Sequence, residues 1–113
     1  MAPRVYYLKV DYGRLLNDAP DLTPAEFQAW AATVNRKATE LHCGKCQTMP
    51  TETGEESAEM AYMFADGNNA FAFMQWLADE TERLGALAHM SLGVLPSDYP
   101  DFGEPLKPGK YEA

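Results

Sequence analysis

The chain has 113 residues, of which 46% are hydrophobic and 12% aromatic, and it carries a formal net charge of −8. This length fits one domain with one core, because two cores would each be too small to be stable without disulfides or metals. The composition is that of a globular protein. Direct nucleic-acid binding is disfavoured, since the sequence has no cluster of Lys and Arg that could neutralise phosphates.

The N-terminal segment and the cysteine content predict a cytoplasmic protein. Lys9 and Asp11 interrupt the apolar stretch that a secretory signal needs, and no segment approaches the roughly 18 apolar residues of a membrane span. Cys43 and Cys46 are the two cysteines of the chain, which is typical of free thiols in a reducing compartment. For a phage-encoded protein this compartment is the host cytoplasm.

The first predicted element is a β-strand over residues 5–12, where β-branched and aromatic residues dominate. The alternation of the strand places Tyr6, Leu8 and Val10 on one face. Residues 13–22 follow, and their Asp, Asn and Pro content predicts a loop.

A helix begins next, because Thr23, Pro24 and Glu26 form a capping box with proline at the first helical position. Gly44 is the expected C-terminal cap. Apolar residues recur at steps of three and four, which predicts one stripe facing a core. The residues of this stripe are Phe27, Trp30, Ala31, Val34, Ala38 and Leu41.

A hairpin with an acidic tip is predicted after this helix, from strands at 45–51 and 59–65 joined by turn residues at 50–56. A second helix then starts at the caps within 66–69 and ends at Gly85. Its apolar stripe consists of Ala70, Phe73, Leu77 and Leu84, with Trp76 beside it.

The last elements are a strand at 86–95 and a tail at 96–113 that contains four prolines. The resulting order of strand, helix, strand, strand, helix, strand predicts an α+β fold of the ferredoxin-like βαββαβ kind. Right-handed crossovers give a four-stranded antiparallel sheet of order 4-1-3-2 with both helices on one face. We expect residues 1–95 to form this single domain, and the tail to run extended over its surface.

The motif H-C-G-K-C at residues 42–46 is the first candidate site. Redox catalysis is disfavoured, because Cys43 follows the C-terminus of a helix, where the dipole opposes a thiolate. A zinc site needs four ligands, and His89 is expected at the opposite edge of the sheet. We therefore predict structural thiols with no metal or cofactor. The alternative is a metal held between two chains by Cys43, Cys46 and His42.

The sheet face without helices, here called the open face, is the second candidate site. The side chains expected on it are Tyr7, Lys9, His89 and Ser91, together with either Met60 and Tyr62 or Ala61 and Met63. Such a face is too apolar to be left in water, so the tail, a second copy of the chain or a partner protein should cover it. His89 beside Tyr7 would suit acid–base chemistry in a pocket between two facing sheets.

The third candidate site is a predicted acidic ridge. Residues 45–85 hold eight acidic and two basic residues, whereas residues 1–44 hold five of each. The ridge would consist of Glu52, Glu55, Glu56 and Glu59 on the hairpin and Asp79, Glu80 and Glu82 late in the second helix. A charge run is usually a solvated face, but complementary fields also orient docking on a basic partner.

Two classes of function follow from these sites. The first is a small acidic, non-catalytic binding protein that docks on a basic surface of a partner, similar in size and charge to phage inhibitors of nucleic-acid-binding host defence machines. The second is a dimeric domain of the α/β-barrel type with a small-molecule or substrate pocket on the open face. The chain lacks the G-x-S-x-G, H-E-x-x-H and phosphate-loop motifs, so no catalytic residue is assigned.

Overall fold

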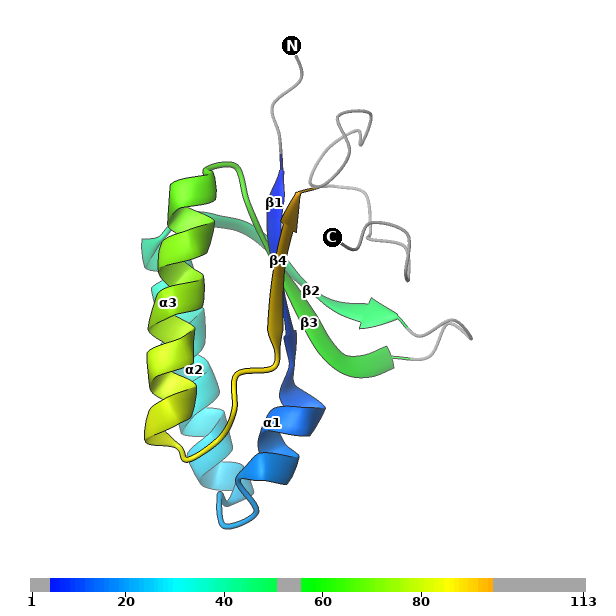
Figure 1. The fold of residues 1–113 in the computed structure, drawn as a ribbon, viewed down its shortest axis with the longest axis vertical. Helices are drawn as coiled ribbons and strands as arrows, with labels where there is room; N and C mark the ends of the chain where they lie inside the picture. The colour runs from blue at the N-terminus through cyan, green and yellow to red at the C-terminus, as the bar shows by residue number, and fades with distance from the viewer. Residues whose placement is uncertain (1–4, 51–55, 95–113) are drawn as a thin grey trace.

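The computed structural model describes residues 5–50 and 56–94 (Figure 1). These residues form a small α+β fold with a four-stranded antiparallel sheet and three helices. In chain order the elements are β1 (Tyr6–Asp11), α1 (Tyr12–Asp18), α2 (Pro24–Glu40), β2 (Cys43–Pro50), β3 (Glu56–Phe64), α3 (Gly67–Arg83) and β4 (Met90–Val94).

The sheet has the order β2-β3-β1-β4, which is the predicted order 4-1-3-2 in the opposite direction. All three pairs are antiparallel, and the register is fixed by central pairs such as Leu8 opposite both Tyr62 and Leu92. Both long helices, α2 and α3, cover the same face of the sheet (Figure 1). The predicted sheet order and helix placement are therefore confirmed.

The two long helices begin where the capping residues predict. In α2, the Glu26 backbone N–H donates to Thr23 Oγ1 at 3.1 Å, and the Thr23 N–H donates to Glu26 Oε1 at 3.1 Å. These two bonds complete the capping box. In α3, Asp66 Oδ1 accepts from the Asn68 N–H at 2.8 Å. Gly85 follows the helix with φ of 78°, a conformation that glycine adopts without strain.

The end of α2 differs from the prediction. Leu41 is its C-cap, and the positive φ of 62° falls on His42. Gly44 instead belongs to β2, where the register shifts between Cys43 and Lys45 in a β-bulge. Gly44 is therefore part of the edge strand and not the C-terminal cap of α2.

The predicted loop at 13–22 and the start of the last strand also need correction. Residues Tyr12–Asp18 form helix α1, whose N-cap Asp11 accepts a hydrogen bond from the Arg14 N–H. Strand β4 begins at Met90 rather than at residue 86. The reason is that the Leu87 N–H donates to Asp18 Oδ2 at 3.2 Å, so this stretch bonds to α1 instead of joining the ladder.

The core lies between the sheet and the two long helices, and the predicted stripes supply it. Its fully or nearly buried side chains are Leu8, Val10, Leu15, Trp30, Val34, Ala38, Tyr62, Phe64, Ala70, Phe73, Leu77 and Ala86. None of the helices in the described ranges has the length and apolar character needed to cross a membrane. The predictions for the tail at 96–113 lie outside the described residues.

Candidate functional site

The open face carries the residues that the register places opposite one another. Lys9 is paired with Ala61 on β3 and with Ser91 on β4, and Tyr7 is paired with Met63. Directly opposite residues in an antiparallel sheet point to the same side. Of the two sets left open by the sequence, Ala61 and Met63 are therefore the pair on this face.

Tyr62 is not on the open face, which corrects its predicted position. It is paired with Leu8 and is buried in the core beneath the helices, where its ring lies 4.9 Å from that of Phe73. Its hydroxyl is hydrogen-bonded to the hydroxyl of Tyr12. Burial raises the pKa of both phenols, that of Tyr12 to about 12. Both are therefore neutral phenols at physiological pH, and neither supplies charge to the open face.

Tyr7 and His89 are also not neighbours. Tyr7 lies at the level of Gly93, and its ring atoms pack where a side chain at Gly93 would be. The His89 carbonyl accepts a hydrogen bond from the Asp11 N–H at 2.9 Å. Asp11 is four residues after Tyr7 on β1. At about 3.3 Å per strand residue, the two levels are roughly 13 Å apart. The structure therefore separates the predicted acid–base pair.

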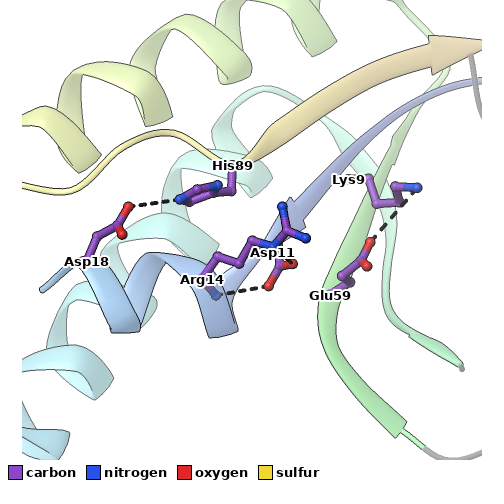
Figure 2. A network of polar contacts seen from close by, with 6 residues as sticks. All are labelled: Lys9, Asp11, Arg14, Asp18, Glu59 and His89. Carbon is purple, nitrogen blue, oxygen red and sulfur yellow. Dashed lines mark hydrogen bonds and ion pairs between the residues drawn. The ribbon is translucent and has the colours of Figure 1, made fainter. Parts of the chain in front are cut away.

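Around His89, however, the structure forms a groove of about 310 Å³ that is open to solvent. It lies where β1 ends in α1 and beside the start of β4 (Figure 2). This volume is at the lower end of the range for small-molecule sites. The groove is lined by Lys9, Asp11, Arg14, Glu59, Ala88, His89, Met90 and Ser91.

The His89 ring is fixed by the Asp18 carboxylate of α1. His89 Nε2 lies 2.8 Å from Asp18 Oδ2, which also accepts the Leu87 N–H. The hydrogen bonds from His89 and Leu87 hold the pKa of the Asp18 carboxyl below its usual range. Because a carboxylate can only accept, Nε2 carries the hydrogen, and in neutral His89 the lone pair is on Nδ1. This arrangement makes Nδ1 the basic atom of the ring.

Two further ion pairs border the groove (Figure 2). Arg14 Nε lies 3.5 Å from Asp11 Oδ2, and Lys9 Nζ lies 3.9 Å from Glu59 Oε2. The Arg14 side chain is 73% exposed, whereas Asp11 is 26% and Glu59 38% exposed. The most accessible charged group of the two pairs is therefore the Arg14 guanidinium, which is more exposed than its partner Asp11, whereas Lys9 is less exposed than Glu59.

Lys9, His89 and Ser91 were expected on the open face from the sequence, whereas Arg14 and Asp18 were not expected at a site, because both belong to α1, which falls in the predicted loop. A signal for this helix exists in the sequence. Asp11 is a suitable N-cap, and Tyr12, Leu15 and Leu16 follow at spacings of three and four.

The structure does not bring the described residues of the predicted acidic ridge together. Glu59 is on β3 beside Lys9, while Asp79, Glu80 and Glu82 are in the last turns of α3, on the other side of the sheet (Figure 1). Glu80 is mostly buried and pairs with Arg83 at 3.2 Å. Glu52 and Glu55 lie outside the described residues, as does the side chain of Glu56.

Cys43 and Cys46 are free thiols on the edge strand β2. Burial raises the pKa of Cys43, and burial together with the charge of Cys43 raises that of Cys46 to about 11. In the metal-free chain both thiols are therefore protonated at neutral pH, which disfavours a nucleophilic or redox-active thiolate. Within residues 5–50 and 56–94, no three or more His, Cys, Asp or Glu side chains are grouped to hold a metal ion.

No family model, curated protein or solved structure matches the chain. The function is therefore argued from the geometry and charge of the groove.

Proposed function

We propose that the protein is a small binding domain whose groove takes up a small oxyanion, a carboxylate or a phosphate. The observation that carries this proposal is the exposure of the Arg14 guanidinium beside the fixed His89 ring. A guanidinium presents parallel N–H donors that match the oxygens of an oxyanion. Nδ1 of His89 adds a second contact, as acceptor for a ligand hydroxyl or, once protonated, as a donor.

The test uses NMR titration of the full chain with inorganic phosphate and, separately, with citrate. Both should shift the backbone signals of Arg14, His89 and Ser91, and Arg14→Gln should abolish the shifts. Arg36→Gln is the matched control, because Arg36 is an exposed arginine on α2 whose guanidinium contacts Thr33. Equal shifts in Arg14→Gln and Arg36→Gln, or no shifts in the wild-type protein, would refute the proposal. A response to only one of the two anions identifies the preferred class.

We further propose that the fold is of the ferredoxin-like βαββαβ kind, with α1 as an addition, and that two copies pair through their open faces. The sheet order and the two helices on one face (Figure 1) support the fold. Ser91, which is exposed on the open face, offers a position for contact with a second copy. Pairing of the sheets would enclose the groove. Light scattering should give a dimer, and Ser91→Arg on the open face should produce a folded monomer. A monomeric wild-type protein contradicts the pairing.

A second candidate function, docking on a basic surface of a partner protein, is favoured by the concentration of acidic residues in 45–85. An inhibitor of a nucleic-acid-binding defence machine, encoded by a phage, is one protein of this type. Reversing Glu52, Glu55 and Glu56 to Lys should then slow association, and salt should weaken wild-type binding. Capture of the same partner by the triple variant, at low and high salt alike, contradicts docking.

A further inference from the structure

The two cysteines and one methionine occupy the same side of the β2–β3 edge. Cys43 is paired with Phe64 and Cys46 with Tyr62, and these two partners are separated by one residue on β3. An unbroken strand would place Cys43 and Cys46 on opposite faces, since they are three positions apart. The bulge between Cys43 and Lys45 adds the extra residue that returns both thiols to one face.

Met60 brings a third sulfur to this face. It lies two residues from Tyr62 on β3, so its side chain points to the same side as that of Tyr62. Cys46 Sγ and Met60 Sδ are 3.0 Å apart. Cys43 and Met60 are both half-buried and pack against the core, while Cys46 is exposed at the edge of the sheet. The sulfur cluster is therefore partly buried through Cys43 and Met60 and reachable from solvent through Cys46.

The remaining bonds of the thiols do not prevent them from binding a ligand. The Cys43 thiol donates to the Lys45 carbonyl at 3.2 Å, a weak bond that loses its proton donor when the thiol is deprotonated. The strand partners of the two thiols, Phe64 and Tyr62, are two residues apart on β3, so Cys43 and Cys46 occupy neighbouring positions on one face. This placement allows both thiols to bind a common ion.

The kind of donor decides which ion suits this arrangement. Zinc prefers four tetrahedral ligands from Cys, His and carboxylates, and the described residues contain no group of three or more such side chains. Two thiolates and one thioether are soft donors, the kind that copper(I), zinc and iron–sulfur clusters take; a set of three that includes a thioether fits copper(I) best. A thioether does not help to bind zinc, so Met60 is informative about the identity of the metal.

We propose that Cys43, Cys46 and Met60 form a binding site for copper(I). In this site the ion is held by two thiolates and one thioether, and binding releases the two thiol protons to solvent. Copper stays in the +1 state, so no oxidant or reductant is consumed. The site is independent of the proposed oxyanion groove, which lies on the other face of the sheet.

The test is an anaerobic titration of the reduced full chain with copper(I) supplied from bicinchoninate as a coloured competitor. The wild-type chain should take up one ion. Cys46→Ser should abolish binding in the presence of the competitor. Met60→Leu keeps the side-chain volume but removes the sulfur, and it should weaken binding by at least about tenfold, in line with the cost of losing a ligand or its support.

Two control variants separate this site from unspecific binding by thiols. Met74→Leu changes a half-buried methionine on α3, and His42→Asn removes the imidazole while tolerating the positive φ. Both should bind as the wild type does, and circular dichroism checks that each variant is folded. Wild-type affinity in Met60→Leu, absence of copper(I) uptake, or stoichiometric zinc uptake that displaces copper(I) would each overturn the proposal.

Discussion

Substitution of Gly93 by alanine tests the packing of the open face most directly. A Cβ at this position would lie 2.5 Å from the Tyr7 hydroxyl oxygen, 2.6 Å from Cζ and 2.8 Å from Cε1. Real Cβ atoms essentially never come within 3.0 Å of another heavy atom. Tyr7 is only 3% exposed, so its ring cannot simply swing into solvent. Overpacking of this kind costs about 1–3 kcal/mol.

The control is Gly85→Ala, where the structure predicts a cost of a different origin. Gly85 has φ of 78°, and a Cβ there meets nothing within 4 Å. The substitution should lower the free energy of unfolding by about 1–2 kcal/mol, only because alanine disfavours the left-handed backbone conformation. Replacing Tyr7 by leucine should therefore rescue Gly93→Ala but not Gly85→Ala. In a double-mutant cycle, the coupling between positions 7 and 93 should reach at least about 0.5 kcal/mol, the lower end for contacting residues.

Urea unfolding followed by circular dichroism measures these differences, and thermal unfolding supports them, since about 1 kcal/mol lowers the Tm of a domain near this size by about 4–8 °C. The reasoning would be refuted if Gly93→Ala unfolded within about 0.5 kcal/mol of the wild type, the usual range for neutral surface changes. It would equally be refuted if Tyr7→Leu rescued both glycine variants.

Three further predictions concern the caps and the titrating groups. Thr23→Ala removes the acceptor of the α2 capping box and should cost about 1 kcal/mol in urea unfolding; an unchanged midpoint would show that the box is not formed in solution. Because burial raises the pKa of Tyr12 from 10.0 to about 12, the unfolded chain ionises first. The free energy of unfolding should thus fall from pH 10.0 toward 12, and less steeply in Tyr12→Phe. In His89→Ala, NMR titration of the Asp18 carboxyl carbon should show a pKa closer to 3.8 than in the wild type, and no movement would exclude the His89 contact.

The parts of the fold that could be predicted from sequence are those decided by neighbouring residues. The Thr23–Glu26 capping box, the cap at Asp66 and the alternation around Leu8 each depend on a few adjacent positions, and the structure contains all of them. Helix α1 was missed because its seven residues include Gly13 and Asn17, which disfavour helix interiors. Its stability comes from tertiary contacts, such as the burial of Leu15 in the core.

The candidate site was harder to predict because it depends on contacts between distant parts of the chain. The hydrogen bond between Asp18 and His89 joins residues 71 positions apart, and no local pattern reveals it. The face of Tyr62 could not be chosen from its own strand, where both faces carry apolar residues. Likewise, the common face of Cys43 and Cys46 follows from a β-bulge, which requires knowledge of the partner strand.

The central position of β1 has a consequence for how the protein folds. Tyr6 in this strand pairs with Phe64 on one side and with Val94 on the other. During synthesis, the apolar strand β1 is therefore made early, but it cannot pair until β3 and then β4 have been synthesised. Sheets that depend on such distant pairs fold slowly compared with helical bundles. Until Met90–Val94 has left the ribosome, one side of β1 offers unpaired backbone groups, so nascent chains that stop short of it should be prone to aggregate.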